Sequence, residues 1–110
     1  MYQDNIVLCG ASSYEQKYYL NEDFNGLPQG IKDELKIACV LYTTEAGGII
    51  TIEYDEEGNL HFVTEAKEND YMFDEIGSGL KIKQMQMDKK ELWESLEMFY
   101  KVFFLGEEVE

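Results

Sequence analysis

Few residues in this chain have the type and spacing that catalysis or metal binding requires. His61 is the only histidine, so a metal site built from several histidines is excluded. In an alternating strand it faces away from Leu60 and Phe62, where a carboxylate such as Glu53 across a hairpin could make it a general base. A surface histidine on a strand is the more common arrangement, and we expect that here.

Two acidic segments could offer oxygen ligands to a divalent cation. Residues 55–59 lack the twelve-residue spacing and the terminal bidentate glutamate of an EF-hand loop, which favours a solvated turn. Residues 65–75 are better interpreted as a solvated loop followed by an acidic first helical turn. We therefore predict no metal site and no cofactor, although the second segment carries five carboxylates: Glu65, Glu68, Asp70, Asp74 and Glu75.

The segment Gly77-Ser78-Gly79 could be mistaken for a phosphate-binding loop. Carboxylates precede it and the Walker lysine is missing, so we do not expect phosphate there. Two glycines in a helix interior cost about 2 kcal/mol relative to alanine, which implies a kink, a break or very close packing. If this part of the chain forms a pocket, its candidate residues are Asp74, Glu75, Gly77 and Gly79.

Cys9 and Cys39 show neither metal-ligand spacing nor a cationic neighbour that would lower a thiol pKa. We expect both to be buried, Cys9 in a strand and Cys39 in the apolar row of a helix. Two reduced thiols and an N-terminus without a signal-peptide pattern predict a cytoplasmic protein.

Charge excludes several classes of partner. The chain has 23 acidic and 9 basic side chains, a formal charge of −14, and no arginine. Such a field repels nucleic acid and anionic lipid, and the guanidinium fork that binds phosphate best is absent. We expect no nucleic-acid and no membrane partner. The acidity serves either solubility or a basic protein partner.

The first half predicts two strands and a helix. Residues 5–11 indicate a buried strand, with a tight turn at 12–13. Residues 14–20 favour a second strand by their aromatic content, although a helix with a capping box competes. A helix starts with Pro28 in its first turn and ends at 47–48. Residues 37–42 are apolar in succession, so a buried strand remains the alternative there.

The second half predicts a β-hairpin over 47–65 and then helical segments. The apolar residues Phe73, Ile76 and Leu80 indicate one helix, and Asp88 with Glu91 resembles a capping box that starts another. The order is ββαββα(α). It predicts an α+β fold, an antiparallel sheet of about four strands with two or three helices on one face, in a single domain over 1–106 with an acidic tail at 107–110.

The last helix is apolar nearly all round, whereas a sheet offers it only one face to bury against. The apolar side chains that the sheet cannot cover predict self-association. A homodimer is the expected form, because most oligomers are two-fold symmetric. The interface candidates are Phe99, Tyr100, Phe103 and Phe104.

Six segments of the chain carry a resemblance to known proteins: residues 14–19, 27–28, 32–35, 47–48, 73–82 and 101–106. In these segments the chain resembles a family of short acidic proteins of unknown function from Gram-positive bacteria. The similarity covers nearly the whole chain. It implies a bacterial cytoplasmic protein and brings no activity, cofactor or site residue.

These observations favour a non-enzymatic protein-interaction domain that self-associates. The alternative is an enzyme or small-ligand-binding domain with a pocket near Asp74–Gly79. A pocket with converging polar groups would favour the alternative, and an apolar patch with an acidic rim would favour the interaction domain.

Overall fold

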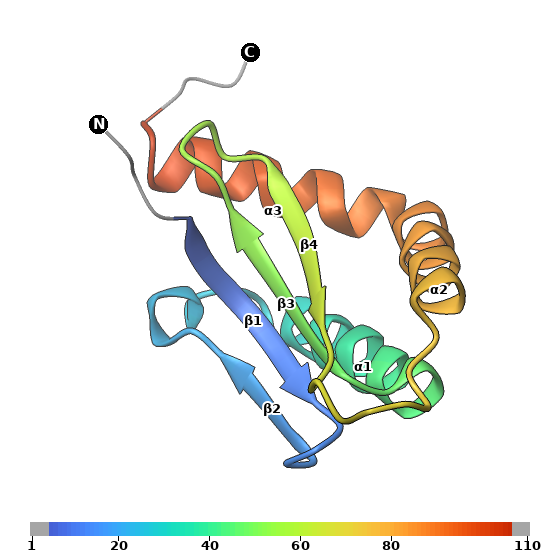
Figure 1. Ribbon diagram of the computed structural model, residues 1–110. Helices are drawn as coiled ribbons and strands as arrows, with labels where there is room; N and C mark the ends of the chain where they lie inside the picture. Colours follow the sequence, from blue (N-terminus) through green and yellow to red (C-terminus); the bar gives the residue numbers. More distant parts are fainter. Residues whose placement is uncertain (1–4, 107–110) are drawn as a thin grey trace.

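The computed structural model describes residues 5–106 and shows an α+β architecture (Figure 1). In this part of the chain, no helix is long and apolar enough to cross a membrane. The elements in chain order are β1 (Ile6–Ser12), β2 (Lys17–Leu20), a 3-10 turn (Glu22–Phe24), α1 (Gln29–Ala46), β3 (Ile49–Tyr54), β4 (Leu60–Glu65), α2 (Glu75–Asp88) and α3 (Lys90–Phe103). The predicted order is confirmed, and the optional last helix is present.

The four strands form one antiparallel sheet in the order β2-β1-β3-β4. The sheet therefore consists of two hairpins, β1–β2 and β3–β4, joined where β1 pairs with β3. A register shift between Val7 and Cys9 marks a bulge at that junction. Helix α1 connects the two hairpins and packs against β1, β2 and β3.

The β3–β4 hairpin follows the alternation in the sequence. Ile50, Ile52 and Tyr54 are fully buried, while the residues between them are half-buried. The predicted loop turns over at Gly58, whose φ of 88° lies in the left-handed region that favours glycine. The period-2 pattern is confirmed on both strands.

The β1–β2 hairpin has a longer turn than predicted. The turn spans residues 13–16, so β2 begins only at Lys17 and the expectation of a turn at Ser12-Ser13 is wrong. The four-residue turn is accommodated by Gln16, which has a φ of 53°. The strand interpretation of this region is confirmed for residues 17–20.

Helix α1 buries one side, as the spacing of Leu35, Ala38, Cys39 and Tyr42 predicts. The alternative strand over 37–42 is excluded. Pro28 is the N-cap residue, one position earlier than expected, because its extended backbone leads into the helix. The predicted glycine stop is confirmed at 47–48, where both residues have positive φ.

Helices α2 and α3 differ from the prediction in two ways. Helix α2 continues without a break through Gly77 and Gly79. The expected capping box is wrong, because Asp88 is the last residue of α2 and Lys89 caps α3 without a side-chain hydrogen bond. The two helices are joined instead by the Trp93 indole, whose Nε1–H donates to the Met85 carbonyl at 3.1 Å.

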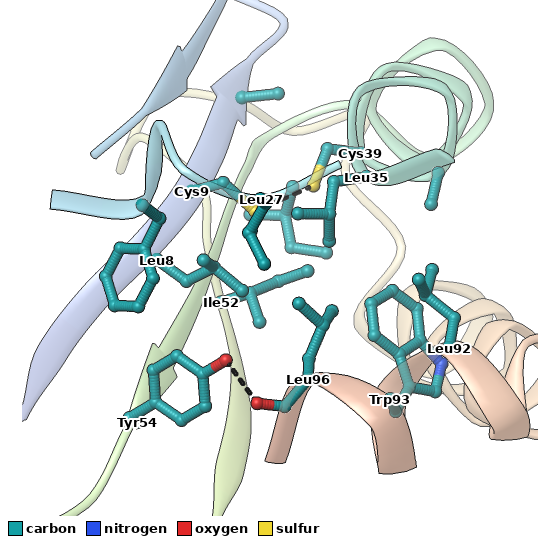
Figure 2. Packing of buried hydrophobic residues seen from close by; sticks show 14 of the residues in the cluster. Leu8, Cys9, Leu27, Leu35, Cys39, Ile52, Tyr54, Leu92, Trp93 and Leu96 are labelled. Carbon is teal, nitrogen blue, oxygen red and sulfur yellow. Dashed lines mark hydrogen bonds between the residues drawn. The ribbon is translucent and has the colours of Figure 1, made fainter. Parts of the chain in front are cut away.

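The core lies between the sheet and the helices α1 and α3 (Figures 1 and 2). The Tyr54 hydroxyl crosses it and donates to the Leu96 carbonyl of α3 at 2.8 Å. Burial raises the pKa of Tyr54, which keeps that hydroxyl a donor. Around it lies an aromatic cluster, in which the Tyr54 and Tyr100 ring centroids are 4.2 Å apart.

Candidate functional site

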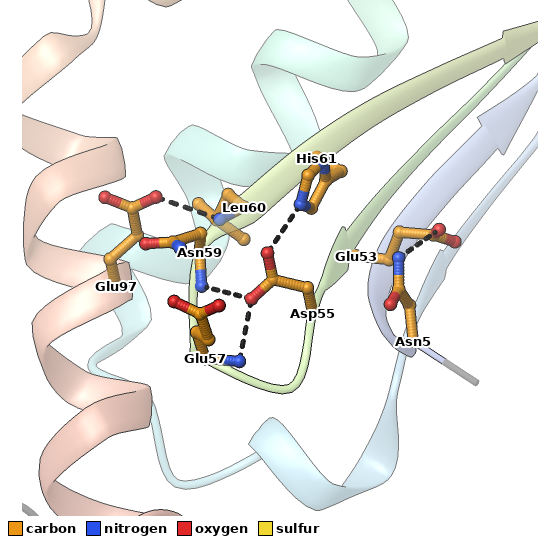
Figure 3. A network of polar contacts seen from close by, with 8 residues as sticks. All are labelled: Asn5, Glu53, Asp55, Glu57, Asn59, Leu60, His61 and Glu97. Carbon is orange, nitrogen blue, oxygen red and sulfur yellow. Dashed lines mark hydrogen bonds and ion pairs between the residues drawn. The ribbon is translucent and has the colours of Figure 1, made fainter. Parts of the chain in front are cut away.

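The loop of the β3–β4 hairpin holds a compact polar network (Figure 3). The Asp55 carboxylate accepts from the N–H groups of Glu57 and Asn59 at 2.9 and 3.0 Å, and its second oxygen lies 2.7 Å from His61 Nε2. Partial burial opposes the charged form, but these contacts outweigh it and lower the pKa of Asp55. The carboxylate is thus engaged in closing the turn.

His61 contacts Asp55 and not Glu53, and its side chain is 52% exposed, so the expected surface histidine on a strand is confirmed. Glu53 lies opposite His61 in the register, yet its carboxylate accepts from the Asn5 amide at 3.1 Å. His61, which lies opposite Glu53 in the register, turns instead toward the hairpin loop. Glu97 of α3 accepts from the Leu60 N–H at 2.9 Å, which connects α3 to the start of β4.

A hollow of about 470 Å³ lies beside the N-terminus of α2. Of the four predicted pocket residues, Glu75 and Gly79 line it, whereas Asp74 and Gly77 do not. Asp74 is the N-cap residue, and its carboxylate accepts from the Ile76 N–H at 3.1 Å. The full lining is Thr64, Glu65, Ala66, Lys67, Glu68, Asp70, Phe73, Glu75, Ser78 and Gly79.

The Asp70 carboxylate on the rim of this hollow already has a hydrogen-bond partner. Its carboxylate accepts from the Tyr14 hydroxyl at 2.6 Å, which raises the pKa of Tyr14. The Lys67 N–H donates to the same hydroxyl at 3.1 Å, and its ammonium lies over the Tyr14 ring. Across residues 5–106, no three His, Cys, Asp or Glu side chains are grouped so that they could hold a metal ion. The hollow could accept a cationic group.

The two cysteines meet in the core, which their separation in the sequence did not indicate. Both are fully buried, as predicted, and their Sγ atoms lie 3.8 Å apart (Figure 2). The contact with Cys39 and burial together raise the pKa of Cys9. The thiolate that reacts with oxidants and metals is therefore disfavoured.

Helix α2 carries apolar side chains on the side turned away from the molecule. Ile76, Leu80 and Met87 are 78%, 62% and 75% exposed and follow one helical face; we call them the outer stripe. Of the three apolar residues that predicted this helix, Ile76 and Leu80 belong to it and face solvent, whereas Phe73 precedes it. The inward positions are Ser78, Ile82 and Met85.

Ser78 makes the inward contact of α2. It is buried, and its hydroxyl forms a hydrogen bond with the buried hydroxyl of Tyr42 on α1. Gly77 and Gly79 do not lie against another element. A Cβ at Gly79 would meet nothing within 4 Å, and one at Gly77 would meet only the Asp74 side chain. The contact between the two helices is therefore made by the serine and not by the glycines.

A groove of about 200 Å³ separates α1 and α2. Ile37 and Leu41 form its apolar wall on α1, and both are more than half exposed. Two ion pairs bridge the helices, Lys81–Glu45 at 3.1 Å and Lys89–Glu34 at 3.5 Å. We call the outer stripe together with Ile37 and Leu41 the α1–α2 surface.

The predicted interface on α3 divides into buried and exposed residues. Tyr100 is 4% exposed and belongs to the aromatic cluster. Phe104 is 43% exposed; its ring stacks on Tyr100 and lies tilted against Phe24, with both centroids 5.0 Å away. Phe103 is 72% exposed, and its ring lies 4.8 Å from the half-buried Phe99. Phe103 is the most exposed of the four interface candidates.

Comparison with known proteins gives a family and no activity. No curated protein and no solved structure matches this chain. One family model, described as a family of unknown function, DUF6145, matches residues 5–108 and so covers every element of the fold. The chain belongs to this family of unknown function, DUF6145.

Proposed function

We propose that this protein is a non-enzymatic interaction domain that forms a homodimer through its α1–α2 surface. The observation that carries the proposal is the outer stripe of α2, three large apolar side chains that are each at least 62% exposed. Exposed apolar side chains that share one helical face are typical of interaction sites.

The α1–α2 surface offers enough apolar side chains for a stable contact. Burying one large apolar side chain contributes roughly 1.5–3 kcal/mol. In a two-fold dimer each copy contributes the five side chains of this surface, so ten side chains meet at the contact. Association costs on the order of 4–15 kcal/mol in lost freedom of motion, which partial burial of ten side chains offsets.

Charge favours a second copy as the occupant. Residues 76–90 carry four lysines and one carboxylate, whereas the chain as a whole has a formal charge of −14. On α1, Glu34 and Glu45 already pair with Lys89 and Lys81 of α2 within one copy, so this surface carries less negative charge than the rest of the molecule. A two-fold contact through this surface is self-complementary and brings less negative charge together than a contact through another face would.

The remaining acidic surface fits a basic protein partner. The hairpin loop presents Glu56 and Glu57 to solvent, and α3 presents Glu91 and Glu94. We place the protein in the cytoplasm of a Gram-positive bacterium. The resemblance described above supports this, and so do two buried cysteines that are not joined in a disulfide.

Sedimentation equilibrium at high micromolar concentration and moderate salt tests the proposal. We expect a dimer that tightens as salt screens the net negative charge. Leu80→Asp should yield a folded monomer, because the side chain is exposed within one copy. Phe103→Asp is the matched control and should remain dimeric. A monomeric unmodified protein, or a dimeric Leu80→Asp variant, would contradict the proposed interface.

A small-ligand-binding domain with a site near Asp74–Gly79 is the second candidate. It is favoured by the hollow of about 470 Å³ at that place. Four carboxylates and one lysine line the hollow, so the ligand would be cationic. A calorimetric titration with spermidine tests it, with Glu75→Gln expected to weaken binding. A heat signal unchanged by Glu75→Gln would exclude a specific site.

A further inference from the structure

A second hollow, of about 610 Å³, lies between the β1–β2 hairpin and α1. Its volume falls within the range of small-molecule sites. The hairpin contributes residues from both strands and the turn, and α1 contributes positions one turn apart along its side. The lining consists of Ser12, Ser13, Gln16, Lys17, Tyr18, Lys36, Val40, Thr43 and Thr44.

This hollow has a charge opposite to that of the molecule. Lys17 and Lys36 line it, and no carboxylate does. Three other hollows on the described part of the chain each combine their lysines with at least two carboxylates. Neither Lys17 nor Lys36 forms an ion pair with any residue in 5–106. Two unneutralised lysines in a strongly acidic protein create a local site for an anion.

Hydrogen-bond donors surround the two lysines. The Ser12 hydroxyl oxygen accepts from the Glu15 N–H at 3.3 Å, which leaves its own proton free to donate. The side chains of Ser13, Gln16 and Thr44 make no hydrogen bond within residues 5–106. Thr43 differs, because its hydroxyl donates to backbone carbonyls of α1. Val40 and Tyr18 add apolar wall.

The turn beside the hollow has an unfavourable backbone conformation. Gln16, with its φ of 53°, is the one non-glycine residue of the described range in the left-handed region. Glycine or asparagine would adopt this conformation at lower cost. Strained residues of this kind gather at binding sites, where the side chain has a use that offsets the strain. The side chain of Gln16 lines the hollow.

We propose that this hollow binds a small organic phosphate. A phosphate monoester carries close to two negative charges and three acceptor oxygens, which match two lysines and several hydroxyl and amide donors. Val40 and Tyr18 contact the organic part. Lys36 on α1 and Lys17 at the start of β2 supply the positive charge of the site. The proposal does not depend on the dimer.

A titration of the full chain with phenyl phosphate, followed by amide NMR shifts, tests this inference. We expect saturable shifts in residues 12–18 and 36–44. Inorganic phosphate should bind at the same place more weakly, because it lacks the apolar part. Benzoate, with one charge on a similar body, should bind at least about tenfold more weakly than phenyl phosphate.

Three variants distinguish specific binding in the hollow from non-specific electrostatic attraction. Lys36→Gln should weaken binding by about tenfold to a hundredfold, the value of one charge-assisted hydrogen bond. Lys83→Gln removes the same charge from α2 and should leave binding unchanged. Gln16→Gly should keep or raise the melting temperature while it weakens binding, which a purely structural turn residue would not do.

Several outcomes would overturn the proposal. Absence of saturable shifts at millimolar phenyl phosphate would exclude the site. Equal weakening by Lys83→Gln and Lys36→Gln would show attraction by overall charge alone. Benzoate binding as tightly as phenyl phosphate would assign the hollow to carboxylates.

Discussion

Helices α2 and α3 have the same length of 14 residues and are held in opposite ways. Helix α3 buries Leu92, Trp93, Leu96 and Tyr100 on one side. Helix α2 has a single fully buried residue, Ser78, and turns its outer stripe to solvent. Thus α3 is part of the core, whereas α2 reaches the core only through the partly buried Ile82 and Met85, is held by polar contacts to α1, and leaves its outer stripe exposed.

The largest expected loss of stability comes from a substitution in α3. Leu96→Ala should lower the free energy of unfolding by about 2–5 kcal/mol, because the side chain is almost completely buried. Leu80→Ala on α2 should change it by less than about 0.5 kcal/mol, as is usual for an exposed site. Urea unfolding followed by Trp93 fluorescence, at a concentration low enough to keep the chain monomeric, measures both. Equal losses would remove the distinction between the helices.

The polar attachment of α2 should come next. Ser78→Ala leaves the Tyr42 hydroxyl buried without a partner, so we expect a loss of about 1–3 kcal/mol. Tyr42→Phe removes the hydroxyl on the other side of the contact. If the hydrogen bond holds α2 in place, the double variant should lose clearly less than the two single losses added together. Strict additivity in this double-mutant cycle would argue against the contact.

The two phenylalanines at the end of α3 sharpen the comparison within one helix. Phe104→Ala should cost about 1–2 kcal/mol, because its ring stacks on Tyr100 and lies tilted against Phe24 while part of it stays exposed. Phe103→Ala should cost less than about 0.5 kcal/mol at low concentration. Thermal unfolding compares them. A large loss at Phe103 would place that ring in the core.

The smallest expected change is an increase in stability. Gly79→Ala in α2 should stabilise the protein by about 0.5–1 kcal/mol, because the position is helical and open. Gly77→Ala should gain less, since its Cβ would lie 2.6 Å from the Asp74 carboxylate that caps the helix. Chemical denaturation of both variants provides the measurement. A loss at Gly79 would indicate that the open side of α2 is covered in solution.

The sequence predicted those parts of the fold whose apolar spacing was regular. The alternation of Ile50, Ile52 and Tyr54 indicated a half-buried strand. The row from Leu35 to Tyr42 favoured a helix face, although the apolar run at 37–42 left a buried strand as the alternative. Helix α2 was predicted but its buried face was not, because its inward contact is a serine and a pattern of apolar residues cannot reveal a buried polar pair.

The candidate sites were less accessible to such reasoning. The pairing of His61 with Asp55 depends on how the hairpin loop folds back, and the contact of Cys9 with Cys39 depends on how α1 crosses the sheet. The hollow with the two lysines combines residues from a hairpin and a helix. The positive φ at Gln16 has no signature in the sequence, because glutamine rarely adopts it.

The junction of β1 with β3 has a consequence for how the chain folds. Each hairpin contains only short-range pairings, which form quickly, whereas β1 meets β3 only after the intervening helix has brought the two halves together. Until then each half presents an unpaired apolar strand edge that could join to a neighbouring nascent chain. The charge of −14 makes such half-folded chains repel one another. We therefore expect the acidity of this protein to limit aggregation while the pairing of β1 with β3 forms.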